Sequence, residues 1–361
     1  MREKPVHGGN LTWAATIADC PASEILDFSA SINPLGPPQS ALRAITQGIK
    51  QLTAYPDPNY WHLKQTIAHW HQIPPNWVLP GNGAAELLTW AGRELAKKKV
   101  TYLLTPSFAD YWRCLTTFGA KIAGYRLNLD SQPIPFPLDL DAKGDYTQSG
   151  LIINNPHNPT GQLWEKTEIR SYLDKFALVV VDEAFMDFLP TSQTESLIAD
   201  IQQRDNLIIL RSLTKFFSLP GLRIGYAISQ PRRLEAWQKW RDPWAVNTLA
   251  VLAAEAAIQD QKFQTSTWRW LTTAKSDLYQ RLRAIPGLQP RWGAANFLLV
   301  KTNVASDLLQ LELLKRHKIL IRDCSTFPQL GNKYFRLAIR SSQENHRLLS
   351  ALEQVIPHLK H

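Results

Sequence analysis

The sequence predicts an α/β fold, in which a large domain with a mostly parallel sheet covered by helices on both faces precedes a smaller α+β domain. From Val100 to about Ser229, short apolar runs alternate with helical patterns, which is typical of parallel strands joined by helices. Beyond Ser229 the pattern changes to long helices with a few strands, and 361 residues are enough for two domains. We expect an N-terminal arm at 1–38 that contributes to a site, a large domain at 39–230 and a small domain at 231–361.

The composition is that of an ordinary globular protein, with 44% hydrophobic and 20% charged residues. Cys20, Cys114 and Cys324 are widely scattered, which argues against a disulfide framework and against a thiol metal cluster. No apolar run reaches membrane-spanning length, and residues 1–10 show no charged-then-apolar leader. We therefore expect a cytoplasmic protein with no membrane partner.

The formal net charge of +9 is compatible with nucleic-acid binding, because basic proteins attract phosphate polymers. However, the basic run Lys97-Lys98-Lys99 lacks the interleaved aromatic residues that stack on bases. We expect no nucleic-acid partner, and a cofactor-free basic binding protein is the alternative from another class. The same charge suits an enzyme whose cofactor and substrate are both anionic.

The elements are assigned from short apolar runs for strands and from helical periodicity for helices. The arm up to Pro38 is expected to be loop-like. The large domain is predicted to contain helices at 40–52 and 60–71, a strand, glycine turn and helix within 77–96, a strand at 100–104, a helix at 108–118, a strand at 151–154, a helix at 166–176, and strands at 178–181 and 207–210. The small domain is predicted to contain helices at 232–241, 247–259 and 263–284, strands at 295–300, 319–322 and 334–339, and a final helix at 344–358.

Three histidines, His62, His69 and His71, lie within one predicted helix but do not form a predicted metal site. His69 and His71 fall on different faces of that helix, and no carboxylate completes a set of ligands. We expect solvated surface histidines and no metal.

Candidate site residues follow three consecutive predicted strands at the point where each strand ends. Asn158 lies in the stretch after the strand at 151–154, Asp182 directly follows the run at 178–181, and Lys215 follows the run at 207–210. Ligands gather at the carboxyl ends of the strands in such sheets. Their joint appearance there favours a single site.

Lys215 is the candidate reactive group. Burial makes a lysine lose its proton more readily, and the neutral amine can form a Schiff base with a carbonyl. The neighbouring Ser212, Thr214 and Arg223 could together hold a phosphate. The combination predicts a site for pyridoxal 5′-phosphate, whereas the alternative is a lysine placed there by chance among 40 Lys and Arg residues.

Three further residues fit this cofactor. An ionised Asp182 after an apolar strand would be costly unless it faced a cation such as a protonated pyridine nitrogen. Asn158 can donate to a phenolate oxygen, and Phe108 can stack on a flat ring. Taken singly, these residues could instead be a helix cap, a turn residue and a core residue.

Two other stretches could bind an anion. Small residues at 81–86 start a helix, whose first N–H groups attract negative charge. The arm combines glycines with polar donors in His7-Gly8-Gly9-Asn10 and again within 27–38, although a surface arm with turns is the alternative.

With these residues assembled, the chain resembles the fold-type I pyridoxal-phosphate enzymes of the aspartate aminotransferase superfamily and its histidinol-phosphate aminotransferase branch. The resemblance extends over nearly the whole length and implies a seven-stranded sheet and a homodimer. It implies that Lys215 is the Schiff-base lysine, that Asp182 pairs with the pyridine nitrogen, and that Asn158 of Asn-Pro-Thr-Gly bonds the ring oxygen. Arg336, in Tyr-Phe-Arg-Leu-Ala-Ile-Arg, resembles the arginine that clamps the substrate α-carboxylate.

The same resemblance implies the remaining cofactor contacts. Phe108 of Pro-Ser-Phe-Ala-Asp-Tyr would stack on the ring, and Tyr55 of Tyr-Pro-Asp-Pro would reach the cofactor phosphate from the second subunit. The other phosphate contacts would be Ala84, Ala85, Ser212, Thr214 and Arg223.

Four segments resemble one family within this superfamily, the L-threonine O-3-phosphate decarboxylases of cobalamin biosynthesis. They are His7-Gly8-Gly9-Asn10, Ser31-Ile32-Asn33-Pro34-Leu35-Gly36-Pro37-Pro38, Asp182-Glu183-Ala184-Phe185 and Pro243-Trp244-Ala245-Val246-Asn247. This resemblance implies production of (R)-1-amino-2-propanol O-2-phosphate. The candidate contacts of the substrate phosphate are Arg322, His7, Ser31 and Asn33.

A histidinol-phosphate aminotransferase or a related aminotransferase is the alternative activity, because its cofactor site would look almost the same. The sequence departs from the aminotransferase pattern at two positions. Phe185 replaces the tyrosine of Asp-x-Ala-Tyr, and Ala84 lacks the hydroxyl often found in the phosphate turn. Asn158 is then the obvious donor to the ring oxygen.

Overall fold

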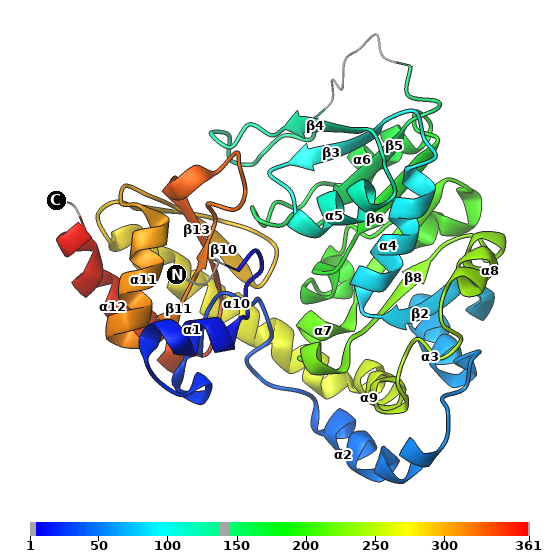
Figure 1. Cartoon of the computed structure of the whole chain (residues 1–361), viewed down its shortest axis with the longest axis horizontal. Helices are drawn as coiled ribbons and strands as arrows, with labels where there is room; N and C mark the ends of the chain where they lie inside the picture. The colour runs from blue at the N-terminus through cyan, green and yellow to red at the C-terminus, as the bar shows by residue number, and fades with distance from the viewer. Residues whose placement is uncertain (1–4, 138–144, 360–361) are drawn as a thin grey trace.

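The computed structural model describes residues 5–137 and 145–359, and a mostly parallel sheet crosses its larger part (Figure 1). Within these residues the sheet has seven strands in the order β2-β8-β7-β6-β5-β3-β4. They are β2 (Val78–Asn82), β3 (Thr101–Thr105), β4 (Ile122–Arg126), β5 (Gly150–Asn154), β6 (Leu178–Asp182), β7 (Leu207–Ser212) and β8 (Ile224–Ile228). β8 runs antiparallel to both of its neighbours, and the other pairs are parallel. The predicted α/β class is confirmed.

Two strands of this sheet, β4 and β8, have weak sequence signals. β4 lies at the edge of the sheet and is partly exposed, so its residues form no continuous apolar run. β8 is fully buried but contains Gly225, and a glycine inside a strand weakens the strand pattern.

Helices cover both faces of the sheet, because alternate residues of its central strands point to opposite sides. In β6, Val179 and Val181 belong to one apolar cluster, whereas Leu178 and Val180 belong to the other. The first cluster includes residues of α3 (Trp61–His71), α6 (Lys166–Leu173) and α9 (Thr248–Gln259), and the second includes residues of α4 (Ala84–Leu95), α5 (Ala109–Thr117) and α8 (Pro231–Trp240). The short α7 (Leu213–Phe216) follows β7, and α2 (Gln39–Gly48) packs against α9.

The expectation that all three histidines of α3 are solvated is wrong for His71. Its Nε2 lies 2.7 Å from the hydroxyl of Tyr226, which is buried on β8. Burial lowers the pKa of His71 well below its ordinary value. The last turn of α3 packs against the sheet, so only His62 and His69 are exposed.

The C-terminal part builds a smaller antiparallel sheet with strand order β12-β13-β10-β9. Its strands are β9 (Leu288–Arg291), β10 (Phe297–Thr302), β12 (Arg322–Asp323) and β13 (Tyr334–Ala338), and its helices are α10 (Gln261–Ala284), α11 (Ser306–His317) and α12 (Ser342–Val355). The single strand predicted at 319–322 is wrong. The chain there forms β11 (Ile319–Leu320), which pairs with β1 (Leu26–Asp27), and then β12, which pairs with β13.

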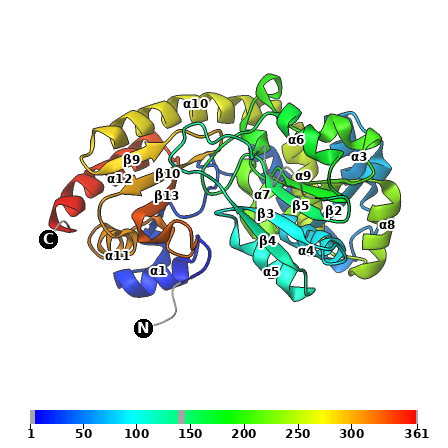
Figure 2. The ribbon, with the colours of Figure 1, turned by 90° about the horizontal axis from the view of Figure 1, so that it is seen from above.

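The N-terminal segment is not loop-like throughout, which corrects the prediction for its first half. Residues Leu11–Ala18 form helix α1, whose first turn is capped by the Asn10 side chain accepting from Trp13 N. α1 lies beside α11 (Figures 1 and 2), and β1 runs parallel to β11. The segment therefore packs against the C-terminal elements before the chain enters the large sheet.

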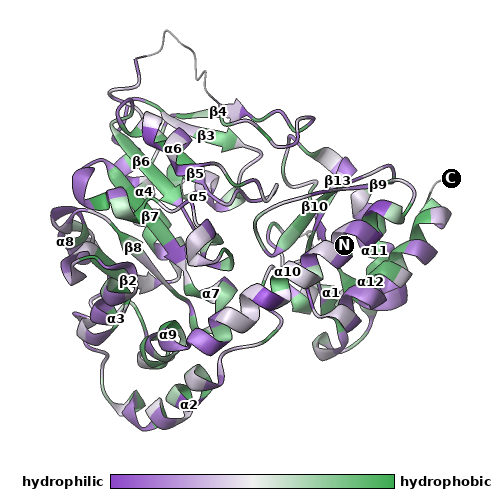
Figure 3. Ribbon diagram, turned by 180° about the vertical axis from the view of Figure 1, so that it is seen from behind, coloured by the Kyte–Doolittle hydropathy of each residue, from purple (hydrophilic) through white to green (hydrophobic). Residues whose placement is uncertain are grey.

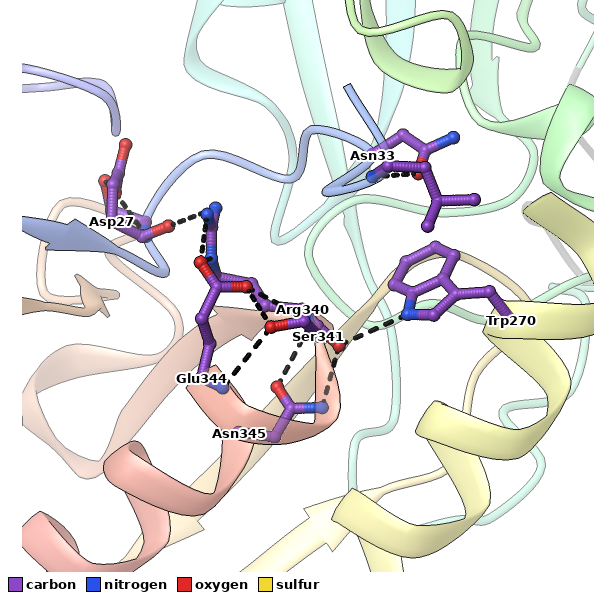
Figure 4. A network of polar contacts seen from close by, with 9 residues as sticks. Asp27, Asn33, Trp270, Arg340, Ser341, Glu344 and Asn345 are labelled. Carbon is purple, nitrogen blue, oxygen red and sulfur yellow. Dashed lines mark hydrogen bonds and ion pairs between the residues drawn. The ribbon is translucent and has the colours of Figure 1, made fainter. Parts of the chain in front are cut away.

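A polar network around Arg340 holds this segment in place (Figure 4). The Arg340 guanidinium donates to Asp27 O at 3.0 Å and to Glu344 Oε1 at 2.7 Å. The backbone carbonyl of Arg340 accepts from Trp270 Nε1 of α10 at 3.3 Å. Arg340 therefore connects β1, α10 and α12, and these contacts fix the residues after β1 beside β13.

The hydropathy of the residues differs between the sheet and the helices that cover it. Apolar residues are concentrated in the central strands, and polar residues lie along the outer helices (Figure 3). Among the helices of residues 5–137 and 145–359, none has the length and hydropathy needed to span a lipid bilayer.

Candidate functional site

A cavity of about 230 Å³ lies where β5, β6 and β7 end, and β13 and the N-terminal segment complete its walls. The ends of β5, β6 and β7 bring Asn158, Asp182 and Lys215 to this cavity, as expected for an α/β sheet. The predicted residues in its lining are His7, Ser31, Ala84, Ala85, Phe108, Asn158, Asp182, Ser212, Thr214, Lys215, Arg223, Arg322 and Arg336. Two predicted residues, Asn33 and Tyr55, are not in the lining.

Lys215 lies in α7, directly after the buried strand β7. Burial lowers the pKa of its amine to about 8, and the positive charges of Arg223 and Arg336 act in the same direction. At this pKa, roughly a tenth of the amine is neutral and nucleophilic at pH 7, far more than for an unperturbed lysine.

Asp182 ends β6 and is held by two donors. Tyr111 Oη donates to Asp182 Oδ2 at 2.6 Å, and Ala184 N donates to Oδ1 at 3.0 Å. Burial raises the pKa of this carboxyl, whereas the hydrogen bond from Tyr111 opposes the shift. A carboxylate facing the cavity from this position could pair with a bound cation.

Asn158 is positioned by a neighbour that sequence reasoning did not single out, Asn154 at the end of β5. Asn154 Oδ1 accepts from Asn158 N at 2.7 Å, and Asn154 Nδ2 donates to Asp182 O at 2.8 Å. The Asn158 amide oxygen accepts from the Arg336 guanidinium. Because an amide that accepts through oxygen directs its NH₂ group elsewhere, the Nδ2 donor is available to a ligand.

Arg336 projects from β13 and is buried at the cavity wall. It donates to Ser29 O at 3.2 Å as well as to Asn158, and it lies 4.9 Å from the centre of the Phe297 ring. Within the described residues its Nε has no partner. Burial lowers its pKa to about 10, so it remains a cation near neutral pH and retains a donor for an anionic ligand.

The start of α4 forms an anion cradle with the end of β7. Ser212 Oγ and Thr214 Oγ1 lie 2.7 Å apart, and Ala84, Ala85 and Arg223 line the same cavity. Within the described part of the chain no side chain caps the start of α4, so its first N–H groups can serve a ligand.

Two glycines make this cradle possible. A Cβ on Gly83, which has φ +76°, would lie 2.5 Å from the Arg223 guanidinium. A Cβ on Gly225 of β8 would lie 2.7 Å from Ala84 N and 2.6 Å from Arg211 O. The hydroxyls of Ser212 and Thr214, the Arg223 guanidinium and the first N–H groups of α4 can therefore bind a cofactor phosphate, although Ala84 contributes no hydroxyl.

The N-terminal segment closes one side of the cavity. His7 lies 5.6 Å from the Phe108 ring, and Arg322 donates to Val6 O and, at 2.7 Å, to Thr326 Oγ1. Ser31 Oγ is buried without a partner among the described residues. On this side of the cavity, Arg322 therefore provides a positive charge and Ser31 provides a hydroxyl that could bind a ligand.

Two predicted residues have other surroundings. Asn33 Nδ2 donates to Phe216 O and to Thr267 Oγ1, both at 2.8 Å, so its amide joins three segments of the fold. Tyr55 is 78% exposed and stacks on Trp244 with ring centres 4.3 Å apart.

Phe185 contributes an apolar wall, packing edge-on against Phe297 at 5.0 Å. At this position of the lining, the ring of Phe185 carries no hydroxyl, whereas the aminotransferase pattern has a tyrosine here.

A charged cluster that sequence reasoning missed lies behind Asp182. Arg211 Nε donates to Glu183 Oε2 at 2.9 Å, and its guanidinium also pairs with Asp187. All three side chains are buried, and burial raises the pKa of Asp187 to about 6. The only sequence signal for this cluster is a set of charged residues beside buried strands.

Comparison with known proteins agrees with this geometry. The family model for aminotransferase class I and II matches residues 23–352. The threonine-phosphate decarboxylase of Salmonella typhimurium is 38% identical over 97% of this chain and 96% of its own length. The structure of the histidinol-phosphate aminotransferase from Clostridium acetobutylicum has a TM-score of 0.82 at 28% identity, covering 93% of this chain and 100% of that one.

A second solved structure has a similar fold. L-threonine-O-3-phosphate decarboxylase from Porphyromonas gingivalis has a TM-score of 0.81 at 24% identity, covering 92% of this chain and 100% of that one. With the sheet, the cavity and the family match taken together, this chain belongs to the aminotransferase class I and II family.

Proposed function

We propose that this chain is a pyridoxal 5′-phosphate-dependent decarboxylase that converts L-threonine O-3-phosphate to (R)-1-amino-2-propanol O-2-phosphate, a step of cobalamin biosynthesis carried out in the cytoplasm. One observation carries the proposal. A single cavity joins Lys215, Asp182 and an anion cradle to two further arginines, Arg322 and Arg336. The 38% identity to the Salmonella typhimurium decarboxylase supports the choice of substrate.

The cofactor contacts follow from the donors present. The neutral Lys215 amine would attach the aldehyde, Asp182 would face the ring nitrogen, and Asn158 Nδ2 would donate to the ring oxygen. The phosphate would lie in the cradle at the start of α4, and Phe108 would stack on the ring. Bound pyridoxal 5′-phosphate would supply an electron sink for bond cleavage at the substrate α-carbon.

The substrate has two anionic ends, and the cavity offers a cation for each. Arg336 retains an unpartnered Nε for the α-carboxylate, while Arg322, His7 and the Ser31 hydroxyl line the side closed by the N-terminal segment. Asn33 is left out of this set because its amide is already bonded to Phe216 and Thr267.

The way the substrate is held decides which α-carbon bond breaks. With the cofactor bound, decarboxylation would require the substrate to be held so that its bond to the α-carboxylate, and not its α C–H bond, is aligned for cleavage. Arg336 would set this orientation from β13. Phe185, which lacks a phenol, presents an apolar surface at the wall where an aminotransferase carries a tyrosine.

A histidinol-phosphate aminotransferase is the second candidate. The 28% identity and TM-score of 0.82 to the Clostridium acetobutylicum enzyme support it, because the same cofactor contacts serve both reactions.

We also propose that the chain works as a homodimer in which Tyr55 reaches the cofactor phosphate of the neighbouring subunit. Tyr55 is exposed, and other large apolar side chains near it in the chain are exposed as well, namely Leu42, Ile49, Leu52 and Trp61. Several large apolar side chains exposed within one short part of the chain support an interface in this region.

The function is tested by incubating the holoenzyme with L-threonine O-3-phosphate and measuring carbon dioxide release and the mass of the product. A parallel reaction contains an amino acceptor or L-glutamate and measures amino transfer. We expect carbon dioxide release that needs no amino acceptor. Amino transfer without carbon dioxide would favour the aminotransferase, and a colourless protein that takes up no cofactor would favour the cofactor-free binding protein.

A further inference from the structure

Tyr111 lies outside the cavity lining, yet it contacts a candidate catalytic residue directly. Its side chain is 2% exposed, and its hydroxyl donates to Asp182 Oδ2 at 2.6 Å. A short O–H···O distance of this kind is typical of a hydrogen bond to a charged carboxylate. The contact joins residues 71 positions apart in the sequence.

The N-terminal end of α5 places two aromatic residues, Phe108 and Tyr111, close to the cavity. Phe108, the residue before α5, lines the cavity, and the Tyr111 ring packs edge-on against it with centres 5.6 Å apart. Tyr111 otherwise belongs to an apolar cluster with Ile152 and Val180. A phenylalanine would satisfy this packing equally well, so the hydroxyl is explained by Asp182 and not by the core.

The bonds to Asp182 fix the plane of its carboxylate. Ala184 N donates to Oδ1 and Tyr111 donates to Oδ2, and each oxygen can accept a further hydrogen bond from a ligand. Burial raises the pKa of Tyr111 well above its ordinary value, and the negative charge of Asp182 adds to this shift. Tyr111 therefore keeps its proton and remains a donor.

We propose that Tyr111 is a positioning residue that keeps Asp182 charged and oriented toward the protonated ring nitrogen of the cofactor. This role rests on the proposed function, because it needs a cofactor with such a nitrogen. Tyr111 acts through Asp182 and touches neither cofactor nor substrate.

The test is a double-mutant cycle read out by cofactor affinity. Apoprotein is titrated with pyridoxal 5′-phosphate, and the dissociation constant is measured by tryptophan fluorescence for wild type, Tyr111→Phe, Asp182→Asn and the double variant. Tyr60→Phe is the matched control, since Tyr60 is also buried and donates to Pro243 O at 3.3 Å outside the cavity lining. We expect Tyr111→Phe to weaken binding about 10-fold in the wild-type background, as for loss of a hydrogen bond to a charged group.

The cycle separates the proposed role from simple packing. In the Asp182→Asn background, Tyr111→Phe should change the dissociation constant less than 2-fold, since there is no carboxylate left to hold. Equal losses in both backgrounds, unchanged affinity of Tyr111→Phe, or an equal loss in Tyr60→Phe would overturn the role. If the wild type itself binds no pyridoxal 5′-phosphate, the proposed function fails and the role fails with it.

Discussion

At the scale of single residues, a shifted pKa does not by itself identify a nucleophile. Burial lowers the pKa of both Lys215 and Lys275 to about 8. Lys275, on α10, donates to Gly293 O at 2.9 Å and does not line the cavity. Lys215 shares its cavity with Asp182 and the anion cradle, so the surroundings of the amine define its chemistry.

The pH dependence of cofactor attachment follows from the pKa of Lys215. Only the neutral amine reacts, and burial moves its pKa from 10.5 to about 8. The rate at which the apoprotein attaches pyridoxal 5′-phosphate should therefore rise with pH and level off above about 8. Stopped-flow absorbance measures this rate, and a rate that still rises toward 10.5 would show that Lys215 is not perturbed.

The sequence predicts residues whose chemistry depends on strand ends and fails where it depends on distant contacts. Asp182 and Lys215 lie in the cavity because each follows a buried apolar run. Asn33 has the right chemistry for a phosphate, but its amide bonds to Phe216 and Thr267, which are 183 and 234 positions away. The role of Tyr111 also depends on a partner far along the chain, so the motif Pro-Ser-Phe-Ala-Asp-Tyr alone could not reveal it.

At the scale of elements, the cradle depends on the close approach of β8 to the start of α4. Gly225 permits this approach, since a Cβ there would meet backbone atoms of Arg211 and Ala84. Backbone atoms cannot move aside as a flexible side chain can. The glycine that obscures β8 in the sequence is thus the residue that brings α4 close enough to bind an anion.

Gly225→Ala should therefore weaken phosphate binding specifically. We expect the dissociation constant for pyridoxal 5′-phosphate to rise at least about 10-fold, as for loss of one or more charge-assisted hydrogen bonds. The affinity for pyridoxal, which has no phosphate, should change much less. Gly221→Ala is the control, because a Cβ there meets no atom of the described residues within 4 Å.

Titration of both variants with both ligands checks this prediction. Equal losses for pyridoxal and pyridoxal 5′-phosphate in Gly225→Ala would mean that the substitution disturbs the whole cavity and not the cradle.

The sequence predicts the elements with strong periodic patterns, whereas it does not reveal elements that are short, partly exposed or, like β8, interrupted by a glycine. The apolar runs of β3, β5, β6 and β7 mark them clearly because both faces of these strands are covered. The apolar pattern at 319–322 predicts one strand in place of β11 and β12, because a sequence pattern cannot show that Ile319 pairs with Leu26 while Arg322 pairs with Arg336.

At the scale of the whole molecule, the N-terminal segment links the C-terminal elements to the site. It pairs with β11, contacts Arg340 through Asp27 O, and carries His7 and Ser31 to the cavity. These contacts connect the two ends of the sequence, which is why local patterns predicted an irregular arm. The division into 1–38, 39–230 and 231–361 stays a prediction.

The proposed homodimer is tested by complementation between two inactive variants. Tyr55→Ala and Lys215→Ala should each lose most activity, because one lacks a phosphate contact and the other lacks the amine. After mixing and subunit exchange, a mixed dimer contains one site with both native residues, so decarboxylase activity should return. Activity that stays absent in a demonstrated mixed dimer would place Tyr55 and Lys215 in the same site of one subunit.

The most direct measurement is the identification of the residue that carries the cofactor. The holoenzyme is reduced with borohydride, digested, and the modified peptide is located by mass spectrometry, with Lys215→Ala treated in parallel. We predict a pyridoxyl phosphate adduct on Lys215, absent from the variant, and none on Lys275, whose pKa is also about 8. An adduct on Lys275 or on another lysine, or no adduct in a protein saturated with the cofactor, would contradict the assignment of Lys215 as the reactive amine.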